Sequence, residues 1–291
     1  MNPVKRSLIT LHLTVVLLGG TALFSQIIPL SATDITLGRS VFACLALVLF
    51  LRLSGETLRL NNRRDYIVAA GLGALMALHW TTYFAAMQYA GVSVGMIALF
   101  TFPVITVLIE PLFERIRLVW QDFFSAVTVF IGIALIVPEG SLNNEVTLGV
   151  AIGVGSACLY SFRNLIHRQH FAHYSGAKAM AWQTLVVCVC LLPTGSVALT
   201  DASSSTFWLL VLLGTVFTAL PHALIASALI HLRAKTFSLI ACMQPLYGVV
   251  LAVLLLEEYP SWKTVIGGLL VTSASIYETI NTQKLHRKDP L

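Results

Sequence analysis

The feature that most constrains this sequence is a series of ten apolar runs separated by short polar connectors. Each run is about 20 residues long, which is the length that a helix needs to cross a bilayer. Charged residues make up only 11% of the chain, whereas soluble domains carry about 25%. We therefore expect an all-α integral membrane protein in contact with a lipid bilayer. The expected spans are 8–30, 33–53, 66–89, 92–113, 119–137, 147–168, 177–199, 205–230, 236–256 and 262–281.

The distribution of positive charge predicts how these spans are oriented. If the N-terminus is cytoplasmic and the spans alternate, 16 of the 18 Lys and Arg residues fall on the cytoplasmic side. Basic residues concentrate there in membrane proteins, so we expect both termini to be cytoplasmic and the protein to lie in the inner or plasma membrane. Lys263 is expected outside, and Arg39 within a span. The cytoplasmic set is Lys5, Arg6, Arg52, Arg59, Arg63, Arg64, Arg115, Arg117, Arg163, Arg168, Lys178, Arg233, Lys235, Lys284, Arg287 and Lys288.

Several classes of function are disfavoured by what the sequence lacks. The net charge of +5 comes from these connectors and not from a basic patch with interleaved aromatics, so we expect no nucleic-acid partner. No glycine-rich loop precedes a Lys-Ser/Thr pair, so ATP-driven pumping is not expected. All five cysteines lie in apolar runs without a CxxC spacing. We therefore expect no metal site and no cofactor.

The two halves of the chain resemble each other. Pro103 and Pro245 lie 142 residues apart, each within an apolar run that is followed by an acidic connector, at Glu114 and at Glu258. The alignment divides the ten spans into five and five. An odd number of spans per repeat forces the halves into opposite orientations, as in many secondary transporters. The expected domains are residues 1–138 with the first five spans and residues 139–291 with the last five.

The order of these features resembles the drug/metabolite transporter (DMT) superfamily, in its EamA-domain branch. The matching residues are Gly19-Gly20, Phe24, Arg39 and the two prolines, and the resemblance covers nearly the whole chain. It implies ten transmembrane helices, arranged as two inverted five-helix repeats around a central cavity. It also implies transport of amino acids, metabolites or drugs, often outward. Leu18 stands where family members commonly have Trp, and the two intramembrane histidines described next are not a general feature of the family.

Polar and aromatic residues inside the spans are candidates for lining such a cavity, because ionisable groups are costly in lipid. His79 and His222 fall one position apart in the repeat alignment. They could bind substrate or relay protons, or each could be neutral and bonded to a main-chain carbonyl. Glu110 is a third candidate for proton coupling, unless it reaches interfacial water. The candidates for substrate contact are His79, Trp80, Tyr83, Phe102, Tyr160, Gln183, His222, Gln244 and Arg39.

Pro103 and Pro245 are candidate hinges, because proline bends a helix and frees a carbonyl one turn back. The alternative is a packing kink. Arg39 could bind a substrate carboxylate, extend to the outer interface, or pair with an acid such as Asp34 or Glu258.

The leading hypothesis is a secondary transporter and not an enzyme. It would move a small metabolite, an amino acid or a related compound, by alternating access between the repeats, with export favoured. Protons are the candidate coupling ion, and the protein is expected to be a monomer or homodimer. The alternatives are a lipid or lipid-linked carrier, and an intramembrane enzyme using Ser156 with a histidine such as His222.

Overall fold

The computed structural model describes residues 3–113, 118–137, 144–195, 201–222, 224 and 240–288, with side chains described from Arg6 to Ile280. The end of the expected span 205–230 and the start of 236–256 lie outside the described residues. Several expected loop charges also lie outside them, namely Glu114, Arg115, Arg117, Glu139, Arg233 and Lys235.

Regular structure within the described residues is helical throughout. The helices are α1 (Pro3–Gly20), α2 (Phe24–Ile27), α3 (Ala32–Leu53), α4 (Arg63–Ala90), α5 (Val92–Leu99), α6 (Phe102–Ile109), α7 (Trp120–Ile136), α8 (Glu145–His170), α9 (Gly176–Leu191), α11 (Ser204–Gly214), α14 (Gln244–Leu256) and α15 (Trp262–Lys288). A π-helical segment, Thr215–Ala219, continues α11. The 3-10 turns are Thr21–Leu23, Glu110–Leu112 and Leu192–Thr194.

Within the described residues, each expected span overlaps one or two of these helices. Seven helical stretches among the described residues are long and apolar enough to cross a membrane, and α7 and α14 are shorter apolar helices. The helical, membrane-spanning character of the chain is therefore confirmed, while the count of ten spans stays a prediction. The seven stretches are Arg6–Ile27, Ala32–Leu53, Arg63–Ala90, Val92–Leu112, Glu145–His170, Gly176–Thr194 and Ser204–His222.

Polar connectors fix where the helices begin. The Ser31 hydroxyl accepts the N–H of Asp34 at the start of α3, and Ser175 does the same for Lys178 at the start of α9. Side chains of this kind satisfy N–H groups that have no partner inside the helix. Between α4 and α5 the chain turns at Gly91, whose φ of 83° is a conformation that glycine adopts without steric cost.

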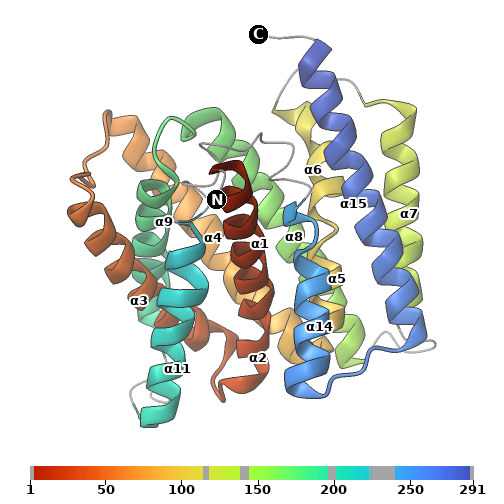
Figure 1. The fold of residues 1–291 in the computed structure, drawn as a ribbon, viewed down its shortest axis with the longest axis horizontal. Helices are drawn as coiled ribbons and strands as arrows, with labels where there is room; N and C mark the ends of the chain where they lie inside the picture. Colours follow the sequence, from red (N-terminus) through yellow and green to blue (C-terminus); the bar gives the residue numbers. More distant parts are fainter. Residues whose placement is uncertain are drawn as a thin grey trace.

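Contacts between helices follow the repeat (Figure 1). Under a shift of 142 residues, α4 corresponds to α11 and α3 corresponds to α9. The contact between α4 and α9 therefore has its counterpart in the contact between α11 and α3. The same shift relates the packing of α6 on α8 to that of α14 on α1. Helices α7 and α15 correspond to each other under the same shift, and they pack side by side at one edge of the molecule. The repeat seen in the sequence is therefore also a repeat of packing.

The two prolines of the repeat lie where helices are interrupted. The expected span 92–113 is broken into α5 and α6 at Phe100–Thr101, and Pro103 lies in the first turn of α6. Pro245 lies in the first turn of α14, directly after a turn at Cys242 and Met243. Because proline has no N–H to donate, it is tolerated in a first helical turn and disrupts a helix interior.

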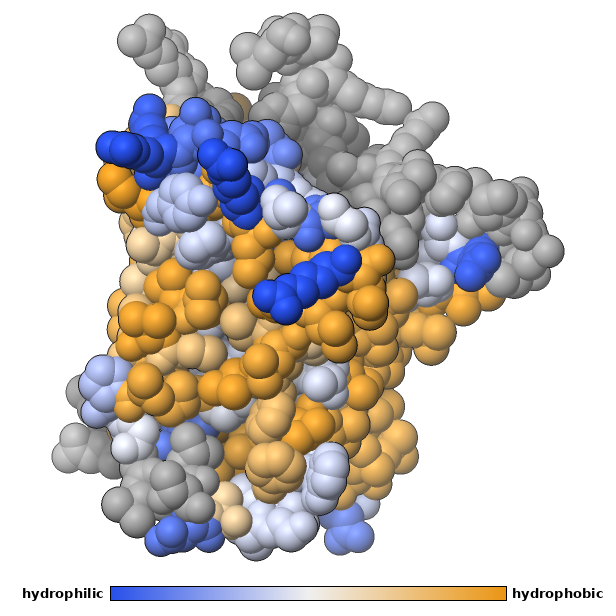
Figure 2. Space-filling model, turned by 90° about the vertical axis from the view of Figure 1, so that its left-hand side faces the viewer, coloured by the Kyte–Doolittle hydropathy of each residue, from blue (hydrophilic) through white to orange (hydrophobic). Residues whose placement is uncertain are grey.

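The outer surface of the bundle is suited to lipid. Figure 2 shows an apolar band around the middle of one face, with hydrophilic side chains gathered at both ends. Large apolar side chains of α3 contribute to this exposed surface, among them Leu45 and Leu53. Such a band is too large for a water-exposed surface and matches the hydrocarbon core of a bilayer.

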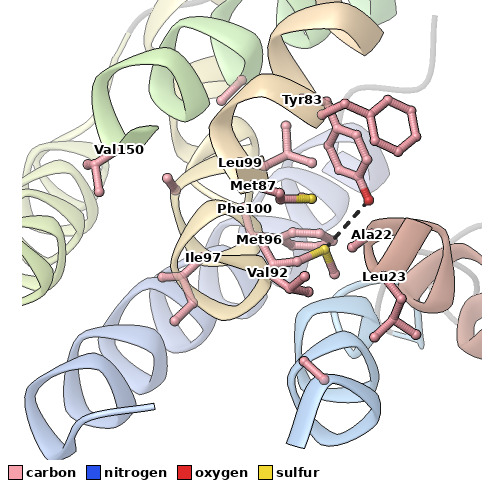
Figure 3. Close-up of a cluster of buried hydrophobic side chains, with 14 of the residues drawn as sticks. Ala22, Leu23, Tyr83, Met87, Val92, Met96, Ile97, Leu99, Phe100 and Val150 are labelled. Atoms are coloured by element: carbon pink, nitrogen blue, oxygen red, sulfur yellow. Dashed lines mark hydrogen bonds between the residues drawn. The ribbon is translucent and has the colours of Figure 1, made fainter. Parts of the chain in front are cut away.

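Beneath this surface lies an apolar core where α4, α5 and the turn after α1 meet. Its members include Phe84, Met87 and Met96, which are fully buried, and Figure 3 shows several of them converging. The Tyr83 hydroxyl donates to the Met96 sulfur at 3.7 Å. Tyr83 therefore directs its polar end into this core.

Candidate functional site

Arg39 is buried in the middle of the protein and lies against Trp80. Its side chain is only 3% exposed, and its Cζ lies 4.0 Å from the centroid of the Trp80 ring. The face of an aromatic ring attracts a cation, so α4 fixes the position of a guanidinium that α3 supplies. Among the residues that the structure describes, none is a hydrogen-bond partner for Nε or Nη1 of Arg39.

His79 lies one residue before Trp80 and is held by α8. Its Nδ1 lies 3.1 Å from the Ser156 carbonyl oxygen and 2.9 Å from Ser156 Oγ. Its ring stacks on Tyr160, with 4.7 Å between the centroids. The alternative in which His79 bonds to a main-chain carbonyl of a neighbouring helix therefore applies to its Nδ1 atom. A role in proton relay stays a prediction.

Tyr160 also contacts the interrupted span. The Phe102 ring meets it edge to face, with 4.9 Å between the centroids. His79, Tyr160 and Phe102 therefore form a continuous row of rings from α4 across α8 to the break between α5 and α6. A change of conformation at the break would therefore move the rings of this row.

A second arginine reaches the same region from α8. The Arg163 Nε donates to Gln183 Oε1 at 2.7 Å, and Gln183, which is fully buried, donates in turn to the Ala179 carbonyl. The charge count above assigned Arg163 to the cytoplasmic side, within the expected span 147–168. The structure places it inside α8, seven residues before the helix ends, where a buried amide on α9 orients it.

Contacts connect these groups. Arg39 faces Trp80, the residue after His79. Tyr160, which stacks on His79, lies three residues before Arg163 on α8. His222 is near enough to Arg39 and Arg163 for their charges to act on it. His222 Nδ1 is 2.6 Å from the Thr218 carbonyl oxygen. We refer to this set as the central cluster, which comprises Arg39, His79, Trp80, Tyr160, Arg163, Gln183 and His222.

Three predicted residues lie apart from the central cluster or contact it weakly. The Gln244 amide donates to the Leu18 carbonyl at 3.3 Å, and Tyr83 directs its hydroxyl into the apolar core. Glu110 forms an ion pair with Arg168, whose side chain is 41% exposed. The Glu110 carboxylate is therefore engaged where α8 approaches the water interface.

The residue before each proline contacts a small residue of the repeat-related helix. The Ser161 hydroxyl donates to the Phe102 carbonyl at 3.0 Å. At the equivalent position 142 residues away, a Cβ on Gly19 would lie 3.0 Å from the Gln244 carbonyl oxygen. In both halves, therefore, the carbonyl group of the residue before the proline contacts a small residue of a neighbouring helix.

Ser156, the serine of the alternative enzyme hypothesis, lies beside His79. Its hydroxyl donates a hydrogen to the His79 carbonyl, and its carbonyl oxygen and Oγ lie 3.1 and 2.9 Å from His79 Nδ1. Because a carbonyl oxygen only accepts, the bond to it requires the tautomer in which Nδ1 carries the hydrogen. In that tautomer Nδ1 is a donor and not the base that a nucleophilic serine needs.

Comparisons with known proteins agree with the architecture. The chain is 22% identical to the uncharacterised transporter YxxF of Bacillus subtilis strain 168, covering 84% of this chain and 80% of that protein. It is 24% identical to the uncharacterised inner membrane transporter YicL of Salmonella typhimurium, covering 99% of both chains. A solved crystal structure superimposes with a TM-score of 0.63 at 14% identity, over 97% of this chain and 99% of the other. This last match shows a shared fold.

The repeat itself is matched twice. The sequence model of the EamA-like transporter family aligns with residues 5–137 and again with residues 147–277. The family is part of the superfamily that the sequence resembles, and its members work in a lipid bilayer on small molecules. Since the two matches together cover most of the sequence, the chain belongs to the EamA-like transporter family.

Proposed function

We propose that this protein is a secondary transporter that moves a small metabolite by alternating access between two inverted repeats, residues 1–138 and 139–291. Amino acids and related compounds are the first candidate cargo, and export is the favoured direction. One observation carries the proposal most strongly. The helix interruptions at Pro103 and Pro245, which are related by the repeat, belong to the same bundle as a polar cluster buried between helices of both halves.

The packing supports motion of one half against the other. Main-chain atoms approach closely where α7 meets α15, because a Cβ on Gly132 would lie 2.9 Å from the Gly267 carbonyl. Small residues allow such close contacts between membrane helices. A tightly packed edge and interrupted helices near the centre are the parts that a rocking movement needs.

A contact between the halves lies at the end that is expected to face outward. The Glu258 carboxylate, in the connector between α14 and α15, accepts the N–H groups of Val92 and Ser93 at 2.9 and 2.8 Å. A carboxylate at a helix N-terminus is stabilised by the free N–H groups and by the helix dipole. We propose that this contact breaks when the outer side opens.

Protons are the proposed coupling ion. His79 and His222 are the candidates that lie in the central cluster, and histidine can titrate near neutral pH. Glu110 suits the role less, because it is already paired with Arg168. One chain contains both repeats, so a monomer would suffice, and a homodimer remains compatible with the proposal.

The experiment is a resistance and efflux screen over amino acids and related metabolites, using deletion and overexpressing strains. We expect at least one compound to accumulate more in the deletion strain and less in the overexpressing strain. Collapse of the proton gradient should abolish the difference while ATP is maintained. If expression changes the cellular level of no compound, the proposal is wrong for this class of cargo.

A further inference from the structure

Arg39 is placed to bind an acidic group of the cargo. We propose that the transported compound is an organic anion, and that Arg39 and Arg163 bind it within the central cluster. This inference rests on the proposed transport function and narrows its substrate class. The shared chemistry is an oxyanion on a small organic body, either a carboxylate or a phosphate ester.

The first observation is the unsatisfied guanidinium. Arg39 is nine-tenths buried or more, and no acceptor for its Nε and Nη1 is present in the described part of the chain. A buried charged donor without an acceptor is among the most costly features that a protein can retain. Guanidinium groups match carboxylate and phosphate oxygens in geometry and charge. An anionic ligand would therefore supply the missing acceptor.

The position of Arg39 suits anion binding better than it suits contact with interfacial water or pairing with an acid of this chain. With 3% of its surface exposed, the side chain does not extend to interfacial water. The Glu258 carboxylate accepts two N–H groups of α5 instead. Asp34 accepts the hydroxyl hydrogen of Ser31 at 2.7 Å at the beginning of α3.

The second observation is the charge balance of the cluster. Arg39 lies against Trp80, and Gln183 uses its side-chain oxygen to hold Arg163. Within the described part of the chain, the central cluster contains two cationic side chains and no carboxylate. An organic anion complements this charge. Within the proposed range of cargo it is favoured over an amino acid, whose ammonium would have no acidic partner in the cluster.

The third observation concerns the repeat. Under the 142-residue shift, the counterpart of Arg39 is Ala181 and that of Arg163 is Thr21. The packing of the helices is reproduced in both halves, but the arginines are not. Their charge is therefore not a requirement of the scaffold, which is the pattern expected of residues that serve an asymmetric ligand.

The test uses the purified full-length protein, both in detergent and reconstituted in proteoliposomes. Probe pairs share one organic body and differ in charge, for example succinate against succinamide, benzoate against benzamide, and glycerol 3-phosphate against glycerol. Binding is measured as the shift in melting temperature with ligand concentration. Transport is measured as uptake of the radiolabelled compound. Arg39→Gln removes the charge, Arg39→Lys keeps it, and Arg52→Gln is the control at an exposed position on the same helix.

We expect an anion, and not its neutral partner, to stabilise the wild-type protein. Arg39→Gln should weaken this binding at least about tenfold, as expected for loss of a charged hydrogen bond, and Arg52→Gln should leave it unchanged. Without ligand, Arg39→Gln should melt at the same temperature as wild type or higher, because it removes an unpaired buried charge. Comparison of the affinities for the carboxylate probes and for the phosphate probe identifies the acidic group.

The outcomes separate this inference from the proposed function. Transport of neutral or cationic compounds that is unaffected by Arg39→Gln would overturn the anion site while leaving the transporter intact. Anion binding that Arg39→Gln abolishes, without uptake of any probe, would support the site and contradict the transport function. Equal affinity of Arg39→Gln and wild type for every anion would also overturn the inference.

Discussion

At the scale of single residues, backbone conformation at the end of α14 offers a clean test. Glu257 has φ 55° and ψ 26°, the left-handed region, and the following N–H of Glu258 closes the turn by bonding to the Ala252 carbonyl at 3.2 Å. This conformation costs a side chain other than glycine about 1 kcal/mol. We expect Glu257→Gly to stabilise the protein by about 0.5–1 kcal/mol, measured by unfolding in detergent.

Gly55 has a similar left-handed conformation but is already a glycine, so the reverse substitution tests the same backbone effect. Its φ is 73°, and a Cβ there would meet nothing within 4 Å. Any effect of Gly55→Ala should therefore come from the backbone alone, with a loss of about 1 kcal/mol. Shifts of the same sign in the two variants would contradict this explanation.

A second residue-scale prediction concerns Glu278 on α15, which sequence reasoning did not single out. It is 1% exposed, and its Oε1 has no hydrogen-bond partner among the described residues. Ser125 bonds to the carboxyl group, while the charge of Asp122 repels it. Glu278→Gln removes a buried like-charge interaction and should stabilise the protein by about 1–2 kcal/mol at pH 8.

Thermal unfolding in detergent measures the gain. Glu56→Gln, at an exposed glutamate, is the control and should change little. A Glu278→Gln variant that is less stable than wild type would show that the carboxylate has a favourable partner.

At the scale of elements, glycines of one helix differ in whether they make contact. Within α8, a Cβ on Gly149 would lie 2.8 Å from main-chain atoms of Ala86 and Ala90, whereas one on Gly155 would meet no described atom within 4 Å. On α4, Gly73 is crowded by Val186, and Gly71 is open to the described residues. The facing helix therefore decides which glycine is needed for close packing.

This contrast gives a matched pair of variants on one helix. Gly149→Ala should destabilise the protein by about 1–3 kcal/mol, because the main chain of α4 cannot move aside cheaply. Gly155→Ala should be neutral or stabilising by up to about 1 kcal/mol, through helix propensity. Unfolding midpoints in the same detergent compare them, and equal effects would contradict the packing of α4 on α8.

Helix positions were largely predictable, because about 20 apolar residues in sequence have few alternatives in lipid. The break at Phe100–Thr101 was foreseen only as a hinge or kink at Pro103. The candidate site was predicted less completely. Arg39, His79, Trp80 and Tyr160 were selected as intramembrane polar or aromatic residues. Arg163 was not selected because a linear charge tally cannot distinguish a connector from a half-buried position inside a helix.

At the scale of the whole molecule, connectors that are distant in sequence gather at two opposite ends. The Asn61 N–H donates to the Tyr174 hydroxyl at 2.6 Å, so the connectors before α4 and before α9 lie together. At the other end, Glu258 bonds to the start of α5. The first end carries the basic residues Arg59, Arg63 and Arg64.

The positive-inside rule then predicts which end faces the cytoplasm. In a cysteine-free background, cysteines at Gly55 and His173 should react with a membrane-impermeant maleimide only after the cells are permeabilised. Cysteines at Asp201 and Tyr259 should react in intact cells, because both are exposed and lie at the opposite end of the bundle. Reversed labelling at all four sites would overturn the orientation but keep the fold. Different labelling of Gly55 and His173 would contradict the fold itself, because the structure ties their connectors together.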